Sequence, residues 1–82
     1  MLVPLASLPQ GARARIVSIN AGCGLVQRLM QMGLFPGTIV EVLENSRGPI
    51  LIQVEGSRIA IGRGMASKIL VEPLEEKKGA QS

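Results

Sequence analysis

The sequence has no His, Asp, Trp or Tyr, and it has one Cys and one Phe. Without His, no Ser–His or Cys–His pair for nucleophilic catalysis exists. All acidic residues are Glu, and the one adjacent pair, Glu75–Glu76, lies in a polar tail. Neither the GxxxxGK[ST] nor the GxGxxG phosphate-binding pattern occurs. The sequence therefore predicts no catalytic residue, and we expect a protein that is not an enzyme.

Ligands for a metal ion are equally scarce. A usual transition-metal site needs three or four nitrogen, sulfur or oxygen ligands, and this chain offers Cys23, scattered Glu and its backbone. We therefore expect no metal site and no cofactor within one chain. A lone cysteine also rules out an intrachain disulfide, which fits a reducing compartment.

Long hydrophobic runs are missing. No uncharged stretch exceeds twelve residues; 16–27 and 29–40 reach that length and both contain Gly, and each is much shorter than the ~20 apolar residues of a membrane-spanning helix. The N-terminus lacks the basic start and apolar stretch of a signal peptide. We expect a soluble, cytoplasmic protein with no direct membrane insertion.

What the chain does contain is 46% hydrophobic residues in a length of 82, which indicates one domain with a real core. Nine Lys/Arg against six acidic residues give a net charge of +3. The charges are scattered without a long run of one sign, which favours a solvated surface. The alternative is a basic face formed by Arg13, Arg15, Arg58 and Arg63.

The hydrophobic pattern is mainly that of short strands. Residues 12–20 predict the first long strand, and its apolar phase changes between Ile16 and Val17, which indicates a bulge. The segments TIVEVLEN, ILIQV, SRIAI and KILVEP predict further strands, and Glu55-Gly56 predicts a hairpin turn.

About five such strands predict a small, mainly β, partly open barrel, with one short helix inserted after the first long strand. Its domain is expected to span residues 1–74. The polar residues 75–82 are expected to form a frayed, disordered C-terminal tail.

The inserted helix is predicted over 25–32, where apolar residues recur four apart and polar residues lie between them. Gly33 suits the left-handed position after a helix, and Leu34 should then contact Leu29 in a Schellman arrangement. Phe35-Pro36-Gly37-Thr38 suits a type II turn. The residues to which we assign this structural role, as helix stop or turn, are Leu29, Gly33, Leu34, Pro36 and Gly37.

Three residues of the same stretch are not explained by local structure: Arg28, Met32 and Phe35. We interpret them as a partner-binding surface. For Arg28 the alternatives are an ordinary surface arginine or an arginine finger for a GTPase. Met30 and Leu34 are expected in the core. Cys23 is expected to be a small buried residue rather than an activated thiol.

The motif RLMQMGLFPG at 28–37, followed by GP at 48–49 and by Val54, Gly56 and RIAIG at 58–62, resembles the FeoA family over residues 3–73. The resemblance implies an SH3-like barrel with an inserted helix. It also implies an accessory or regulatory protein of bacterial or archaeal ferrous iron uptake. The implied partner is FeoB, a membrane Fe(II) transporter that carries a cytoplasmic GTPase domain. At the level of the family, the resemblance also implies transition metal ion binding.

Other functions stay open at this point. A small basic barrel is compatible with nucleic-acid binding, although Phe35 is the one aromatic residue for base stacking. The barrel also resembles the C-terminal domain of metal-dependent repressors of the diphtheria-toxin-repressor class, so a metalloregulator-type interaction domain is a further alternative. Self-association and an effect on GTP hydrolysis stay open too.

Overall fold

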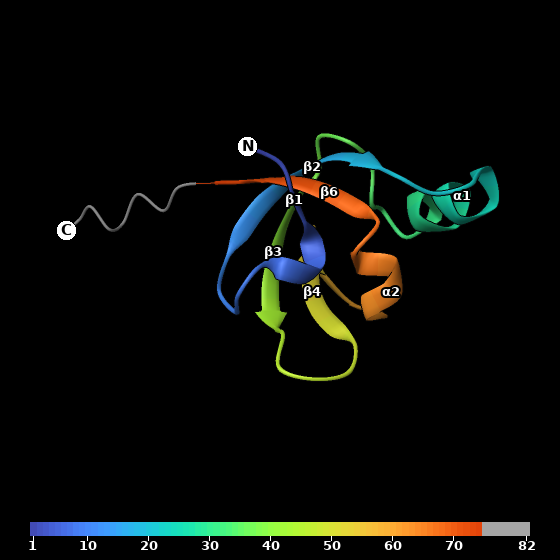
Figure 1. Cartoon of the computed structure of the whole chain (residues 1–82). Coiled ribbons are helices and arrows are strands. Elements are labelled where there is room, and N and C mark those ends of the chain that lie inside the picture. Colours follow the sequence, from blue (N-terminus) through green and yellow to red (C-terminus); the bar gives the residue numbers. More distant parts are fainter. Residues whose placement is uncertain (75–82) are drawn as a thin grey trace.

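A computed structural model describes residues 1–74 of the chain, and the expected polar tail lies outside these residues. The elements are β1 (Val3–Pro4), the 3-10 helix η1 (Leu5–Ser7), β2 (Arg13–Ile19), α1 (Cys23–Gln31), β3 (Ile39–Glu44), β4 (Ile50–Val54), β5 (Ser57–Ile61), α2 (Arg63–Ala66) and β6 (Ile69–Pro73) (Figure 1). The strands form one antiparallel sheet in the order β1-β6-β2-β3-β4-β5.

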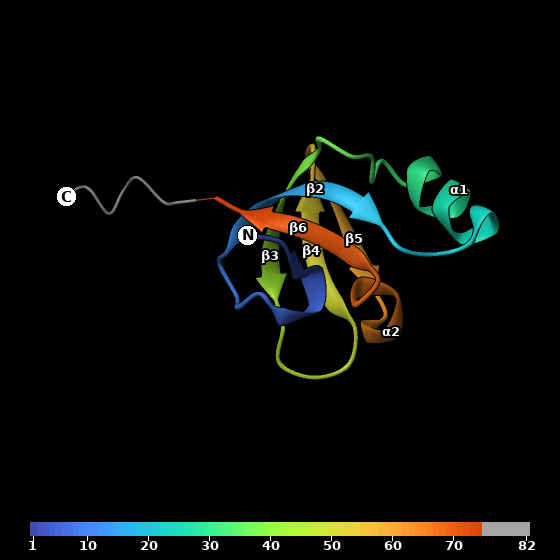
Figure 2. The ribbon, with the colours of Figure 1, turned by 45° about the horizontal axis from the view of Figure 1, so that its top comes forward.

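This sheet curls around a single core, and its two edge strands, β1 and β5, do not pair with each other (Figure 2). The prediction of a mainly β, partly open barrel with a helix after the first long strand is confirmed. The structure has one strand more than the five expected, because β1 is two residues long and shows no alternation in the sequence. Helix α1 begins two residues earlier than expected, at Cys23.

The core consists of aliphatic side chains, most of which alternate inward along the strands, while the others come from the helices and loops. No polar or charged residue of the described chain is buried. The buried residues are Leu5, Leu8, Ala14, Ile16, Leu29, Leu34, Val40, Val42, Ile50, Ile52, Val54, Ile61, Ala66, Ile69 and Val71. Each fully buried side chain of this kind stabilises the fold by roughly 1.5–3 kcal/mol.

Strand β2 contains the predicted bulge. Its register with β6 shifts between Ile16 and Ser18. Before the shift Ala14 and Ile16 point into the core, and Val17, which lies at the shift, is exposed. The extra residue bends β2 and increases its local twist, while β2 pairs with β3 along one edge and with β6 along the other.

The β4–β5 hairpin closes through Glu55-Gly56, as predicted. Both residues have positive φ, 48° and 84°, and Val54 pairs with Ser57 across the turn. Positive φ at both central residues is the requirement of a type I′ turn, whose twist matches that of the strands.

Asn45, which follows β3, ties three separate parts of the chain together. Its Nδ2 donates to the carbonyl oxygens of Ala6 at 3.1 Å and of Leu8 at 2.6 Å. Its Oδ1 accepts a hydrogen bond from Nη2 of Arg63 at 2.6 Å. One half-buried amide therefore holds the N-terminal segment and α2 against the end of β3.

We predict that Asn45→Ala lowers the free energy of unfolding by about 1–3 kcal/mol, because two main-chain carbonyls lose their donor. Asn45→Asp keeps the acceptor for Arg63 but places a carboxylate oxygen near those carbonyls, so it should be at least as destabilising. Urea denaturation monitored by circular dichroism measures both. Arg63→Ala is the control, because it removes an exposed bond alone and should cost less than about 1 kcal/mol; an equal loss in all three variants would contradict this account.

Candidate partner-binding surface

Helix α1 lies on the flank of the barrel, on the same side as α2 (Figures 1 and 2). Leu29 is fully buried, and Leu25 packs against the core beside it. Arg28 lies in the last turn and is exposed. A helix of nine residues has little stability alone, so its attachment through Leu25 and Leu29 holds it in place.

The end of α1 is the predicted Schellman motif. The amide of Leu34 donates to the carbonyl of Leu29 at 3.0 Å, and the amide of Gly33 donates to the carbonyl of Met30 at 2.9 Å. Gly33 has φ of 92°, in the region that favours glycine. Leu29 and Leu34 are both fully buried. The hydrogen bonds and the φ angle match the Schellman geometry that we expect for Leu29, Gly33 and Leu34.

The turn after the helix is fixed to β2. Thr38 N donates to Phe35 O at 3.0 Å and Gly37 has φ of 97°, as a type II turn requires. Gly37 N then donates to Ile16 O at 2.6 Å, and Ile16 N donates to Thr38 O at 2.8 Å. The Pro36-Gly37 turn therefore has the geometry predicted from the sequence. Both main-chain polar groups of Ile16, its N–H and its C=O, bond to the turn.

The structure places all three residues of the predicted surface on the outside. Met32 is 38% exposed and Phe35 is 48% exposed. Arg28 is exposed, and no hydrogen bond or ion pair of its side chain occurs within residues 1–74. Their role in binding stays a prediction, but the required exposure is present.

Two further apolar residues belong to the same region and were not singled out from the sequence. Val17 is 37% exposed and Ile39 is 41% exposed. Val17 follows the residue that bonds to the turn, and Ile39 begins β3 directly after the turn. The phase change at Val17 and the inward alternation of Val40 and Val42 were the signals that could have identified them. We call Arg28, Met32, Phe35, Val17 and Ile39 the helix-end surface.

The four arginines of the alternative basic face do not form one. Arg13 and Arg58 lie in one cross-strand row, with Glu41 and Gln53 between them. Arg15 forms an exposed ion pair with Glu72 at 3.5 Å, and Arg63 bonds to Asn45 as described above. Charges of both signs are therefore interspersed over the outer face of the sheet.

Two smaller expectations need correction. Cys23 is exposed, not buried, because it begins α1 and the helix does not contact the core until Leu25. Met30 is half-buried, because Leu29 occupies the most buried position of this short helix. The expectation for Leu34 is confirmed.

Within residues 1–74 no three His, Cys, Asp or Glu side chains gather into a group that could hold a metal ion. No helix in that part of the chain is both long and apolar enough to cross a membrane. No pocket is present on the surface that these residues form. The candidate site is therefore an outer surface rather than a cavity.

The architecture is that of a small SH3-like barrel with a helix inserted between β2 and β3. Comparison with known proteins agrees. The FeoA domain model matches residues 3–73. An iron uptake regulatory protein (FeoA) of known crystal structure is 43% identical, with a TM-score of 0.85 over 90% of this chain and all of that one.

A Methanocaldococcus jannaschii chain assigned as an Fe(2+) transport protein A is 46% identical over 74 residues, which is 90% of each chain. The crystal structure of zinc-complexed FeoA from Stenotrophomonas maltophilia, described as a procaryotic SH3 domain protein, is 25% identical, with a TM-score of 0.75 over 85% of this chain and 89% of that one. The chain belongs to the FeoA family, whose relatives are named for ferrous iron transport.

The helix stop allows a direct test with two glycines of one helix region. Gly33→Ala should lower the free energy of unfolding by about 1–2 kcal/mol, because an L-residue is unfavourable at φ of 92°. The new methyl group would meet Val54 Cγ1 at 3.9 Å, an ordinary contact, so the backbone alone sets the cost.

Gly24→Ala is the matched control. It lies within α1, and nothing is within 4 Å of its added Cβ. Removing a flexible glycine from a helix should raise stability by about 0.4–1 kcal/mol. Urea midpoints of the two variants should therefore move in opposite directions, and a loss at Gly24 equal to that at Gly33 would refute this assignment.

Proposed function

We propose that this protein is a cytoplasmic, non-catalytic accessory subunit of ferrous iron uptake that binds the cytoplasmic, GTPase-bearing part of an FeoB-like membrane ferrous iron transporter. The contact is the helix-end surface. The observation that carries the proposal is the exposure of Met32 and Phe35 beside an arginine with no partner within the described chain. Family membership supports the process in which the surface acts.

The surface has the physical character of a protein contact. Aromatic, Met and Arg side chains are enriched where proteins meet, and a few such residues supply most of the binding free energy. Phe35 can insert into an apolar depression of a partner, Met adapts to irregular apolar surroundings, and Arg28 can pair with a carboxylate at the rim. The expected complement is therefore apolar with an acidic edge.

The main chain beneath the surface is already ordered. The Schellman bonds and the two bonds of the turn to Ile16 fix the backbone from α1 to β3. Little backbone entropy is then lost when a partner binds. A rigid contact of this kind regulates a GTPase only through different affinities for its nucleotide states, so we expect tighter binding to one of those states.

The nucleic-acid alternative gains no support from the charge arrangement. Phosphate backbones require a continuous cationic track, and the row between Arg13 and Arg58 contains Glu41. We therefore propose a protein partner.

The proposal is tested by titrating the purified cytoplasmic domain of such a transporter, in each nucleotide state, against this chain. Met32→Asp and Phe35→Asp should each weaken binding at least about tenfold, because a carboxylate replaces an apolar contact. Arg28→Glu should weaken it roughly threefold to tenfold. GTP hydrolysis with and without the protein reports any regulatory effect.

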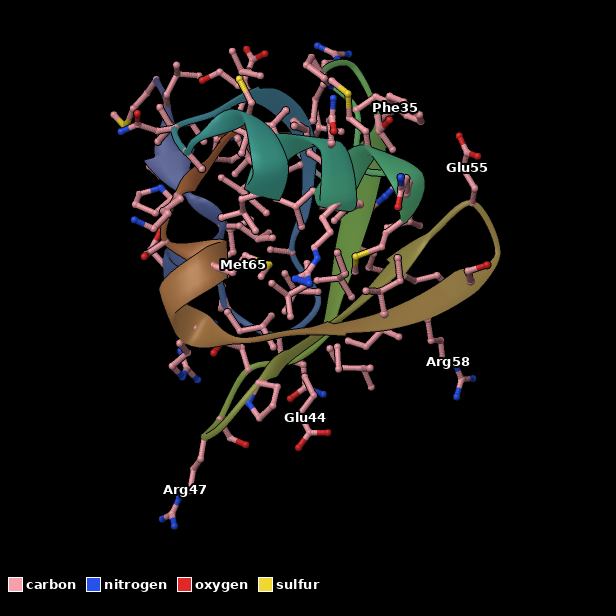
Figure 3. The ribbon with its side chains drawn as sticks, turned by 90° about the vertical axis from the view of Figure 1, so that its right-hand side faces the viewer. Phe35, Glu44, Arg47, Glu55, Arg58 and Met65 are labelled. Carbon is pink, nitrogen blue, oxygen red and sulfur yellow. The ribbon has the colours of Figure 1, made fainter. Side chains whose placement is uncertain are left out.

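Two variants control for charge alone. Arg47→Glu makes the same change as Arg28→Glu at the tip of the β3–β4 loop, at the opposite end of the barrel from Phe35 (Figure 3). Leu2→Asp makes the same kind of change as Met32→Asp at a residue that is 48% exposed. Both should bind as the parent does. Unchanged binding by folded Arg28→Glu, Met32→Asp and Phe35→Asp proteins would refute the proposed contact.

A further inference from the structure

The two edge strands of the sheet differ in length and in proline content. The edge strand β1 has two residues, one of them Pro4, and a short strand with proline resists pairing with another strand. The opposite edge strand, β5, has five residues and no proline. One edge is therefore blocked by its sequence, and the other is suited to accept a further strand.

Strand β5 presents its unused backbone groups at two residues. Val54 pairs with Ser57 at the hairpin turn, and Ile52 with Ile59 and Ile50 with Ile61 follow in register. Because hydrogen-bonded pairs alternate along an antiparallel ladder, the N–H and C=O groups of Arg58 and Ala60 point away from β4. No hydrogen bond in the part of the chain that the structure describes uses these groups, and both residues are exposed.

The side chains of β5 define the partner that such an edge fits. Ile59 is half-buried and packs against the core, so an apolar side chain on an added strand would cover it. Arg58 lies on the outer face, next to Gln53 in the row, and it forms no ion pair among the described residues. Figure 3 shows its side chain pointing away from α1 into solvent. A carboxylate on the added strand would form an ion pair with Arg58 on that outer face.

We propose that the β5 edge binds an extended peptide segment of another protein, in which apolar residues alternate with an acidic residue, by β-strand addition. Main-chain bonds to Arg58 and Ala60 supply the affinity. The contact of apolar side chains with Ile59 and the pairing of the acidic residue with Arg58 supply the specificity. This edge shares no residue with the helix-end surface, and the inference does not depend on the proposed transporter contact.

A second copy of this chain fits the same edge less well. Antiparallel pairing of two β5 strands about Ile59 would place each Arg58 beside the Ala60 of the other copy. Neither guanidinium would then gain a carboxylate neighbour. Charge complementarity therefore favours an acidic segment over self-association.

The test uses the full chain labelled with 15N and a capped synthetic peptide, TVEVTV, with TVKVTV as its charge-reversed control. On titration with TVEVTV, the amides of Arg58 and Ala60 should shift, and their hydrogen exchange should slow at least about tenfold. The amides of Ser57, Ile59 and Ile61 already bond to β4 and should change little in exchange. TVKVTV should bind roughly threefold to tenfold more weakly.

Two variants make the test decisive. Ala60→Pro removes an N–H that points outward, so the β4 ladder is kept, and binding of TVEVTV should fall at least about tenfold. Ala60→Val keeps the N–H and should bind. If Ala60→Pro does not fold, Arg58→Glu serves instead, because it should reverse the preference between the two peptides.

Three results would overturn the proposal: equal peptide binding by folded Ala60→Pro, peptide shifts confined to the helix-end surface, or concentration-dependent shifts of Arg58 and Ala60 without peptide. The last would identify a second copy as the occupant. The two proposals can fail independently of each other. Met32→Asp should weaken transporter binding but leave binding of TVEVTV unchanged.

Discussion

The pairing of the turn with Ile16 is the interaction on which the candidate surface depends. The chain leaves β2, forms α1 and returns, and two short hydrogen bonds fix the point of return: Gly37 N to Ile16 O at 2.6 Å and Ile16 N to Thr38 O at 2.8 Å. These bonds start the β2–β3 ladder, so helix, turn and barrel share one backbone framework. Met32 and Phe35 are exposed because the apolar residues between and beside them, Leu29 and Leu34, already fill the space over the core.

A core made of aliphatic residues alone stabilises the fold, but it contains no buried polar contacts that could specify the strand register. In the described chain no polar or charged residue is buried, so the register must come from main-chain ladders, from the bulge in β2 and from Asn45. Among residues 1–74, Asn45 is the one side chain that bonds to two other segments, through both of its polar atoms. The outer face of the sheet has exposed apolar residues at one end, Val17 and Ile39. Charges of both signs lie across its centre.

Local signals made the helix stop, both turns and the bulge predictable. The conformations of Gly33, Gly37 and Gly56 depend on residues within a few positions along the chain, and short-range sequence patterns describe such geometry well. The exposure of Cys23, the short strand β1 and the bonds of Asn45 were not predictable, because each depends on contacts with residues far away in sequence. In the candidate surface, Arg28, Met32 and Phe35 were predictable because neither the helix stop nor the turn needs their side chains. Val17 and Ile39 were not, because only the folded structure brings them next to the turn.

The position of β6 in the sheet has a consequence for synthesis. This strand comes last in the described chain, yet it lies between β1 and β2 and pairs with both. Ribosomes add roughly 5–20 residues per second, so β1 and β2 emerge several seconds before the strand that joins them. During that interval the edge strand β1 has no neighbour to pair with. Pairing of β1 with the sheet must therefore wait until residues 69–73 leave the exit tunnel, and a chain that stops before them would lack the strand that links β1 to β2.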